Sequence, residues 1–418
     1  MRAQLANPHR PGYTRDPIRT VTGNAGYPAW KRLPISTRLI ALATTSILAV
    51  QPLSAQQDRA RPPASEEAPI AYLLDLTSGQ VLLAREADRR FMPASITKVM
   101  TTFLAFEWIE EGRLVPRQVY TVDPQVWDEW NNVGSTMFLP NRARVTVDDL
   151  IHGVTTVSAN DGAAMLAHGA AGSVDAWVAE MNAKARETGM RDSHFGTPNG
   201  WMDNGKTFTT ARDLGLLAAS MIRKHPSKYR HYVGRTEFTY NGITQPNHDP
   251  ISGRVPGADG IKTGFTNQAG YGFLGSAERN GRRLVMVVAA SPRSSVRDRA
   301  ARELLEWGFG EFEQKQLLGR GAILGEAQVQ GGDAGTVDLV APGGVYISLP
   351  EGSDPEVRLS ISYRGPLRAP IAENEQVAEL LIEAEGIPEY RVSLHAAAAV
   401  GKAGFLDRMA NGIRGWLR

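Results

Sequence analysis

The sequence predicts an α+β domain followed by a small all-β domain. Two β-hairpin patterns lie near the ends of the first domain, and segments with helical periodicity fill the chain between them. A single sheet built from distant parts of the chain, with helices packed on it, satisfies this order. Between residues 315 and 396 helical periodicity becomes rare, and short alternating runs with many Gly and Pro take its place. The 418 residues suffice for these two domains.

Hairpins and helical segments define the first domain, which we expect to cover residues 69–312. One hairpin spans residues 70–84, with its turn at Thr77–Gly79. The other surrounds Asn280-Gly281, a residue pair that suits a type I′ turn. The helical patterns between them cover residues 95–108, 148–171, 176–187 and 210–223.

Composition excludes several classes of function. The net charge is +2 and 22% of the residues are charged, so no strong overall field points to nucleic acid as a partner. The sequence contains no Cys. Disulfides, a thiol nucleophile and Cys-ligated metal centres are therefore ruled out.

The N-terminal region predicts export. Basic residues, among them Lys31 and Arg38, precede an apolar run over residues 39–50, and small residues follow to Ala55. This order is typical of a secretory signal, and the run is shorter than the ~20 residues that span a bilayer. An uncleaved N-terminal anchor is the alternative. We therefore expect a signal region over residues 1–55, a polar linker over 56–68, and a protein that works outside the cytoplasm.

Ser95 and Lys98 form the first candidate catalytic pair. Pro93 suits the start of a helix, and apolar residues at 96, 99, 100 and 103 place Ser95 and Lys98 together beside a buried stripe. A serine hydroxyl becomes nucleophilic when a base removes its proton, and a lysine can be that base if burial keeps it neutral. The S-x-x-K pattern alone is weak, because a helix-capping serine with a surface lysine would give the same letters.

Two further patterns follow in order. Ser158-Ala-Asn160 lies where one helical pattern breaks before the next, and Lys262-Thr263-Gly264 directly precedes the second hairpin. The combination of S-x-x-K, S-x-N and K-T-G resembles the serine penicillin-recognising enzymes, which comprise penicillin-binding proteins and serine β-lactamases.

Further segments narrow the resemblance. Residues 177–190, 193–201, 209–214 and 304–309 are similar to the D-alanyl-D-alanine carboxypeptidases, the low-molecular-mass penicillin-binding proteins of peptidase family S11. The resemblance is strong over residues 66–312. Beyond them, the order of a β-domain followed by a tail is also similar to the family. It implies a penicillin-binding-protein/β-lactamase-like transpeptidase fold, peptidoglycan stem peptides as substrate, β-lactams as covalent inhibitors, and no cofactor.

The resemblance and the chemistry together imply a role for each motif residue. Ser95 would attack the carbonyl between two terminal D-Ala residues, and Lys98 would be the general base, with its pKa depressed by the charge of Lys262. Ser158 would relay a proton to the leaving D-Ala nitrogen. Asn160 would bind the amide on the acyl side and hydrogen-bond to Lys98.

Residues 263–265 and Arg297 would bind the rest of the substrate. The backbone N–H groups of Ser95 and Phe265 would form the oxyanion hole, next to Gly264. Thr263 and Arg297 would receive the terminal carboxylate, for which an arginine is well suited. Arg297 lies seven residues before Leu304, as the family's carboxylate-binding arginine does. The alternative is that Arg297 is a surface residue like its arginine neighbours.

Two residues depart from the pattern of the family. Phe265 stands where relatives often carry His or Tyr, and Thr197 where Asn is commoner.

A class A β-lactamase would carry an E-x-x-L-N loop after the S-x-N element, and none follows Ser158. A non-catalytic wall-binding protein would be expected to have lost Ser95, Lys98 or Lys262, but all three are present. Endopeptidase action on cross-links is the other alternative within the family.

Residues 200–207 fit the P-loop pattern G-x-x-x-x-G-K-[ST] letter for letter. That pattern binds phosphate only where a buried strand feeds a glycine-rich turn that opens a helix. Here the preceding residues are polar, and Trp201 and Asp203 would place bulk and negative charge where phosphates should lie. We therefore expect a connecting loop and no nucleotide. His152, His168 and His248 show no metal-ligand spacing, so we expect structural or surface histidines and no metal.

The tail predicts a membrane-surface helix over residues 401–418. On a helical projection the apolar residues of this segment fall within one arc, with Arg, Asp and Asn outside it. A helix this short cannot span a bilayer, but it suits the membrane interface, and the family carries a comparable anchor. We therefore expect a peripheral protein on the periplasmic face of the inner membrane. A helix docked on the β-domain is the alternative. The apolar residues are Phe405, Leu406, Met409, Ile413, Trp416 and Leu417.

Overall fold

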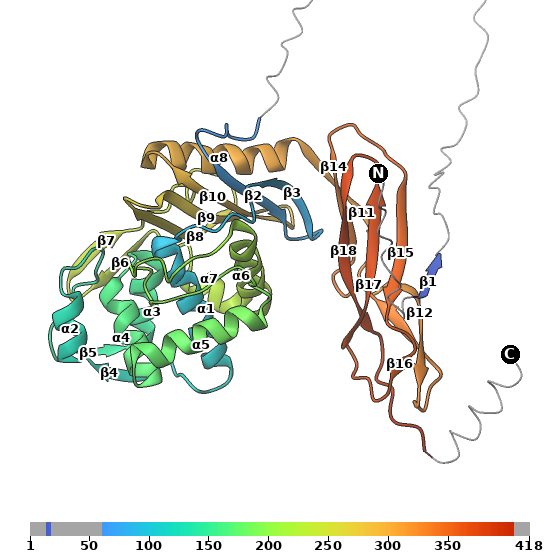
Figure 1. Cartoon of the computed structure of the whole chain (residues 1–418), viewed down its shortest axis with the longest axis horizontal. Helices are drawn as coiled ribbons and strands as arrows, with labels where there is room; N and C mark the ends of the chain where they lie inside the picture. The colour runs from blue at the N-terminus through green and yellow to red at the C-terminus, as the bar shows by residue number, and fades with distance from the viewer. Residues whose placement is uncertain (1–13, 18–60, 405–418) are drawn as a thin grey trace, which may run out of the picture.

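The computed structural model describes residues 14–17 and 61–404, which form two domains side by side (Figure 1). The first domain is built on a five-stranded antiparallel sheet in the order β3-β2-β10-β9-β8. Strands from both ends of the domain therefore share one sheet, as the sequence predicts. The strands are β2 (Ile70–Asp75), β3 (Gln80–Arg85), β8 (Ala258–Thr266), β9 (Gly270–Arg279) and β10 (Arg282–Ser291).

Both predicted hairpins are present. The β2–β3 hairpin turns through Thr77–Gly79, and Asp75 accepts hydrogen bonds from the backbone N–H groups of Thr77 and Ser78 at 3.0 and 3.1 Å. The β9–β10 hairpin turns at Asn280-Gly281, whose φ angles are +51° and +78°. Positive φ at both positions is what a type I′ turn requires.

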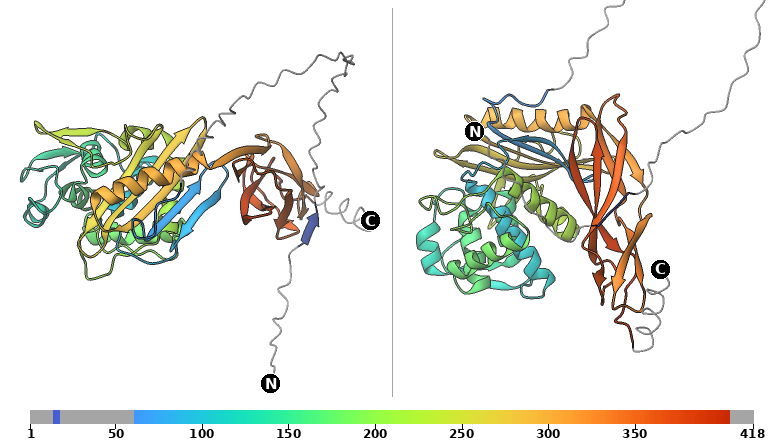
Figure 2. Two further views of the ribbon diagram at one scale, coloured as in Figure 1. Left: turned by 90° about the horizontal axis from the view of Figure 1, so that it is seen from above. Right: turned by 45° about the vertical axis from the view of Figure 1, so that its right-hand side comes forward.

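Helices cover both faces of this sheet (Figures 1 and 2). Helix α8 (Ser294–Gly310) packs on β9 and β10, whereas α6 (Ala211–Lys224) packs on the opposite face beside α1 (Lys98–Glu110). Because side chains alternate along a strand, Ala71 and Leu73 of β2 face α8. Ile70, Tyr72 and Leu74 of the same strand face α6. The remaining helices are η1 (Ala94–Thr97), α2 (Pro124–Trp130), α3 (Val147–Thr156), α4 (Asn160–Ala171), α5 (Val174–Glu187) and α7 (Pro226–Tyr232).

Helix α1 differs from the amphipathic helix that the sequence predicts. Its residues are buried without interruption from Lys98 to Trp108, because α3, α5 and α6 pack around it as well as the sheet. A helix buried on all sides needs no polar face. Consequently the lysine of the S-x-x-K pattern lies within the core.

Two small hairpins complete the first domain. One joins β4 (Val119–Thr121) to β5 (Arg144–Thr146), and the other joins β6 (Glu237–Tyr240) to β7 (Ile243–Pro246). The β6 strand packs against α3, which brings this hairpin close to the S-x-N element at the end of α3.

The second domain is all-β, which confirms the predicted fold class. A seven-stranded sheet has the order β1-β15-β17-β18-β13-β12-β16, and β11 pairs with β14 beside it. Strand pairing continues beyond the expected end at 396, since Lys402 pairs with Gly332. Residues 401–404 are therefore not helical, although the sequence predicted a helix from residue 401. The strands are β1 (Thr14–Pro17), β11 (Phe312–Leu318), β12 (Ile323–Gln330), β13 (Thr336–Val340), β14 (Val345–Pro350), β15 (Val357–Tyr363), β16 (Leu367–Arg368), β17 (Gln376–Ala384) and β18 (Ile387–Ala396).

A buried polar cluster joins the two domains. The Asp75 carboxylate lies 2.7 Å from Nε of Arg282 and accepts a hydrogen bond from Oγ of Ser348 at 2.6 Å. Gln80 exchanges two hydrogen bonds of 3.0 Å with the backbone of Ser348. Arg282 also donates to the backbone oxygen of Phe312 at 2.7 Å. The first hairpin is therefore fixed to the second domain by fully paired polar groups.

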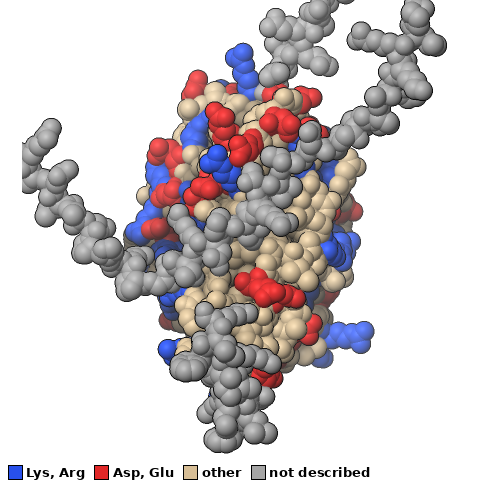
Figure 3. Space-filling view, turned by 90° about the vertical axis from the view of Figure 1, so that its right-hand side faces the viewer, with Lys and Arg blue, Asp and Glu red and all other residues tan. Residues whose placement is uncertain are grey.

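The outer face of the second domain carries charges of both signs. Figure 3 shows acidic and basic side chains interspersed there, between wide uncharged areas. This mixture agrees with the small net charge of the chain. Within residues 14–17 and 61–404, every helix is too short or too polar to cross a membrane. Most of the expected signal region, and the apolar residues of the expected tail helix, lie outside the described residues.

Candidate active site

The three sequence motifs meet at one cleft of about 570 Å³ in the first domain. Ser95 comes from η1, and the residue before it, Ala94, has a φ of +50°. A positive φ is unusual for a residue other than glycine and commonly marks a functional site. This backbone conformation lies at the start of the turn that carries Ser95 to the cleft wall. The other expected site residues on that wall are Ser158, Asn160, Thr263, Gly264, Phe265 and Arg297.

Lys98 lies directly behind Ser95 and is fully buried. Its Nζ lies 2.9 Å from Oγ of Ser95 and donates to Oδ1 of Asn160 at 2.7 Å and to the backbone oxygen of Asn199 at 2.8 Å. In the neutral amine these two donations use both N–H groups and leave the lone pair for the Ser95 proton. Burial, followed by the positive charge of Lys262, lowers the pKa of Lys98 well below its usual value, although Asp161 opposes the shift. Burial and the charge of Lys262 both favour the neutral amine, which is the form that can accept a proton.

Lys262 is the second buried lysine of the site. Burial, followed by the charge of Arg297, lowers the pKa of Lys262 to about 7, and Asp249 opposes that shift. Its Nζ donates to the backbone oxygen of Thr263 at 3.2 Å. Lys98 and Lys262 both border a small cavity behind the main cleft. The two lysines therefore lie beneath the wall that Ser95 and Thr263 form.

The S-x-N element joins α3 to α4. Ser158 has a φ of +63°, and Asn160 begins α4. The Asn160 side chain is held at both ends, because Oδ1 accepts from Lys98 and Nδ2 donates to the backbone oxygen of Val133 at 2.9 Å. Its amide orientation is consequently fixed, with the oxygen toward the lysine.

Asp161 was missed by the sequence reasoning and supports this element. Its carboxylate accepts hydrogen bonds from the backbone N–H groups of Met137 at 3.0 Å and Leu139 at 3.1 Å. Burial raises the pKa of Asp161, while these bonds act in the opposite direction. They tie the loop at 133–139 to α4, and that loop supplies Gly134 and Ser135 to the cleft.

The K-T-G element lies on β8, at the edge of the sheet and against η1. A Cβ on Gly264 would lie 2.4 Å from the backbone oxygen of Pro93 and 3.3 Å from the backbone nitrogen of Ile96. Glycine thus permits a close approach that places residue 265 beside Ser95. The Phe265 side chain is 47% exposed and stacks on Tyr271 with ring centres 4.1 Å apart.

Arg297 enters the cleft from the first turn of α8, where it is 7% exposed. Its Nη1 donates to the backbone oxygen of Gly272 at 3.3 Å, and its Nε lies 2.6 Å from Asp298. Arg299, one of its arginine neighbours, points instead to the exposed side and pairs with Glu67. The burial of Arg297 at the cleft thus distinguishes it from the surface arginine of the alternative interpretation.

The P-loop-like segment is an irregular loop at the cleft. The Thr207 hydroxyl donates to Asp203 at 2.5 Å, and Trp201 packs edge-on against Trp130. Residues 200–207 leave no buried strand and begin no helix, so the phosphate-binding geometry is missing from this described segment. Asn199, the residue immediately before this loop, contributes to the site, because its backbone oxygen accepts a hydrogen bond from Lys98.

Comparison with known proteins assigns the chain to a family. The model of the peptidase S11 family, described as D-alanyl-D-alanine carboxypeptidase, matches residues 56–292, which is more than half of the chain. This chain belongs to the peptidase S11 family. A second match, to the C-terminal domain of penicillin-binding protein 5, covers residues 312–402. The predicted resemblance is confirmed over both domains.

Individual S11 relatives resemble most of the chain. The D-alanyl-D-alanine carboxypeptidase DacD of Salmonella typhimurium is 33% identical over 91% of this chain and 97% of its own length. Penicillin-binding protein 5 from Haemophilus influenzae covers 82% of this chain with all of its own, at 32% identity and a TM-score of 0.69. Penicillin-binding protein D2 from Listeria monocytogenes, in its ampicillin-bound form, covers 60% of this chain with all of its own, at 28% identity and a TM-score of 0.53.

His248 is a further cleft residue of this S11 protein, which the sequence reasoning assigned to the structural or surface histidines. It lies on the wall of the cleft, and burial, followed by the charges of Lys262 and Arg297, lowers its pKa. The sequence carried no signal for this position, since the residues that surround His248 come from β8 and α8. The active-site wall thus includes one imidazole in addition to the motif residues.

Proposed function

We propose that this chain is a serine D-Ala-D-Ala carboxypeptidase that removes the terminal D-Ala from peptidoglycan pentapeptides. The observation that carries the proposal is the 2.9 Å contact between Oγ of Ser95 and Nζ of the fully buried Lys98. Neutral Lys98 takes the proton from Ser95, whose oxygen then attacks the carbonyl carbon between the two D-Ala residues. The C–N bond breaks, D-Ala leaves, and water later releases the acyl group from Ser95.

The other motif residues are assigned by their places in the cleft. Ser158 relays the proton to the departing nitrogen, and Asn160 binds the acyl-side amide while it holds Lys98. The N–H groups of Ser95 and Phe265 stabilise the oxyanion, which is supported by the close packing of β8 on η1. Thr263 and Arg297 bind the terminal carboxylate, as the burial of this cation at the cleft favours.

A β-lactam would acylate the same serine. The ampicillin-bound form of penicillin-binding protein D2, a relative of the same fold, supports this extension. Such an inhibitor offers an amide carbonyl to Ser95 and a carboxylate to the cations of the cleft. The acyl-enzyme that forms is the same kind of ester as the one formed with the peptide.

The test is to incubate the purified protein with a fluorescent penicillin and, separately, with a pentapeptide that ends in D-Ala-D-Ala. We expect stable covalent labelling and release of D-Ala from the wild type, and loss of both in Ser95→Ala with an unchanged circular dichroism spectrum. Labelling of Ser95→Ala at the native rate would refute the assignment of the nucleophile. Labelling of the wild type without D-Ala release would instead favour the endopeptidase, and rapid loss of the label would favour a β-lactamase.

We further propose that the protein is exported and is held at the membrane surface by its C-terminal tail. The signal-like N-terminus and the apolar arc of the tail support this placement. Basic residues, among them Arg414 and Arg418, accompany the arc and favour anionic lipid. A surface anchor would hold the active site near newly made cell wall.

A truncation tests the anchor. Residues 401–404 should be kept, because Gly401, Lys402 and Ala403 form backbone hydrogen bonds or strand pairs with residues 331–333 of the second domain. Deletion of residues 405–418 should release the protein from anionic vesicles and leave soluble D-Ala release within twofold of the full chain. A truncated protein that still sediments with vesicles would refute the anchor, and one that melts several degrees lower would show that the tail docks on the β-domain.

A further inference from the structure

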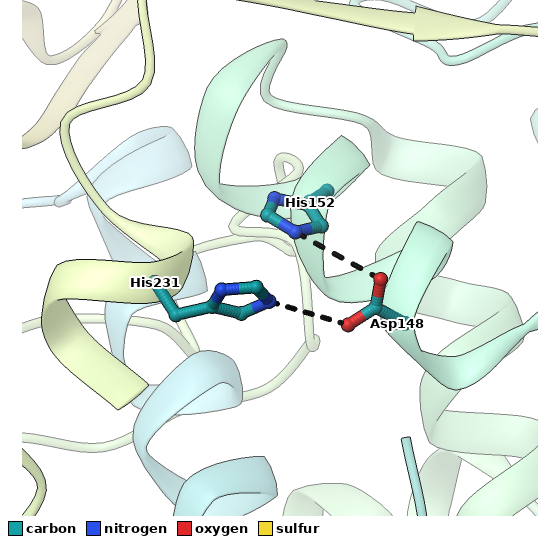
Figure 4. A group of neighbouring side chains, drawn as sticks. All are labelled: Asp148, His152 and His231. Carbon is teal, nitrogen blue, oxygen red and sulfur yellow. Dashed lines mark ion pairs between the residues drawn. The ribbon is translucent and has the colours of Figure 1, made fainter. Parts of the chain in front are cut away.

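Three side chains outside the catalytic cleft converge on one point between two helices. Asp148 and His152 lie one turn apart on α3, and His231 faces them from α7 (Figure 4). One donor atom from each residue, a carboxylate oxygen or an imidazole nitrogen, lies within 4.8 Å of the other two. The described residues that line the cleft do not include any of the three. The group is therefore independent of the proposed reaction.

The spacing of these side chains fits a tetrahedral metal ion. With Zn–N bonds of about 2 Å, neighbouring donor atoms lie about 3.3 Å apart and the centres of two imidazole rings about 5 Å apart. Nε2 of His152 lies 3.9 Å from Oδ2 of Asp148, and Nε2 of His231 lies 3.7 Å from Oδ1 of the same carboxylate. The two ring centres are 5.2 Å apart. Because the three donor atoms already lie within 4.8 Å of one another, side-chain movements of about 1 Å would complete the geometry.

Neighbouring groups hold the carboxylate and the first imidazole in place. The Tyr232 hydroxyl donates to Oδ1 of Asp148 at 2.7 Å, on the side of His231, whereas Oδ2 lies on the side of His152. Each carboxylate oxygen has two lone pairs, so the hydrogen bond to Oδ1 leaves the carboxylate able to bind an ion. The His152 ring stacks on Phe238 with an interplanar angle of 19°. Outer partners of this kind commonly orient metal ligands. Among charged neighbours, Arg235 opposes a cation at His152, whereas the second carboxylate, Asp149, favours one.

We propose that Asp148, His152 and His231 bind a divalent transition-metal ion, with zinc as the ion that this set of two imidazoles and one carboxylate suits. Three protein ligands leave the fourth position to water, which can enter because the His231 side chain is 53% exposed. The spacing of four between Asp148 and His152 is visible in the sequence. The third ligand comes from another helix about 80 residues later, so a complete site could not be recognised from the sequence alone.

The ion would join α3 to α7. These helices already meet where Oγ1 of Thr155 donates to the backbone oxygen of Tyr232 at 2.8 Å. Helix α3 ends at Thr156, directly before the Ser158-Ala-Asn160 element. A bound ion would therefore stabilise the helical pair on which the S-x-N element is built, and it would take no part in acyl transfer.

The test uses the untagged full chain, stripped of metal with a chelator and then titrated with Zn²⁺ by calorimetry. We expect one equivalent to bind with micromolar or tighter affinity and to raise the melting temperature. Asp148→Asn keeps an acceptor for Tyr232, and His231→Gln alters an exposed side chain, so both should fold. Each should weaken Zn²⁺ binding at least tenfold and abolish the thermal shift. D-Ala release by metal-free His231→Gln should equal that of metal-free wild type.

A second histidine–aspartate pair supplies the matched control. Nε2 of His168 lies 3.7 Å from Asp123, as near as His231 is to Asp148, but this pair is not part of a group of three among the described residues. His168→Gln should therefore bind Zn²⁺ as the wild type does. Titration with Co²⁺ should give the intense visible absorption of a four-coordinate site in wild type and His168→Gln only. The proposal is overturned if Zn²⁺ binding does not saturate, or if His231→Gln binds with the affinity of the wild type.

Discussion

At the scale of single residues, the proposed chemistry depends on two buried lysines with different tasks. Burial is the main reason that both pKa values are low, and each lysine also lies near another cation. Lys98 contacts the nucleophile, Ser95, whereas the charge of Lys262 lowers the pKa of Lys98. Arg297 lowers the pKa of Lys262, and Lys262 in turn lowers the pKa of Lys98, so each positive neighbour favours the neutral form of the next amine.

Substitution of Lys262 should change the pH dependence of acylation. Lys98 acts as a base when it is neutral, so the rate falls as the pH drops through its pKa. Lys262→Gln removes a positive neighbour and raises the pKa of Lys98, which should move the acid limb of the rate–pH profile to higher pH. Lys262→Arg keeps a charge and should leave the limb at or below its wild-type position. The rate of acylation by a fluorescent penicillin, measured between pH 5 and 9, gives the acid limb for both variants. Coincident acid limbs for Lys262→Gln and Lys262→Arg would disprove the electrostatic effect.

At the scale of elements, the turn that carries the nucleophile is held between a strand and a loop. Gly264 of β8 and Gly200 of the loop approach this turn from different elements, and a Cβ on Gly200 would lie only 1.9 Å from the backbone oxygen of Ala94. Both contacts are with main-chain atoms, which cannot move aside as a flexible side chain could. The position of Ser95 is therefore set by backbone packing on two sides.

Gly264→Ala should impair acylation through this packing. The added methyl group would lie 2.4 Å from the backbone oxygen of Pro93, so β8 must move away from η1 and take the Phe265 N–H with it. A displacement of about 1 Å can lower a rate roughly 100-fold, and we expect a loss of that order in the acylation rate constant. Gly310→Ala is the control, because its Cβ would meet nothing within 4 Å. An unaltered acylation rate in Gly264→Ala would show that this close approach is unimportant.

At the scale of the whole molecule, the two domains are joined by more than the chain between α8 and β11. Asp75 is 0% exposed and pairs with Arg282 of the same sheet and with Ser348 of the second domain. A buried ion pair adds little net stability, but removal of one partner leaves an uncompensated charge. The cluster thus makes the placement of the β-domain specific.

Asp75→Ala should lower the free energy of unfolding by about 3–5 kcal/mol, because Arg282 would remain buried without its carboxylate. Asp354→Ala is the matched control: Asp354 pairs with Lys315 at 3.0 Å but is 90% exposed, so its loss should change stability by less than ~1 kcal/mol. Urea unfolding followed by fluorescence compares the two, and limited proteolysis near residue 311 reports separation of the domains. Equal stabilities of both variants would mean that the buried cluster contributes no more than a surface pair.

Local patterns in the sequence determined the elements and the family. Alternation and an Asn-Gly pair predicted the hairpins, and the three short motifs with their flanking segments predicted the S11 family, because these signals depend on neighbours along the chain. The helical stripe at Ile96, Val99 and Met100 was a local signal too, but it could not predict that α1 is buried on every side.

Tertiary structure decided which distant groups meet. The Asn199 carbonyl reaches Lys98 across 101 positions of sequence, and Asp161 supports the cleft through backbone N–H groups that have no sequence signature. His248 and His231 acquired their neighbours in the same way, from β8 and α8 in one case and from α3 in the other. A periodic pattern reports which face of an element is buried, whereas a binding site is made by side chains and main-chain atoms from several elements, whose approach is fixed by packing of the folded chain.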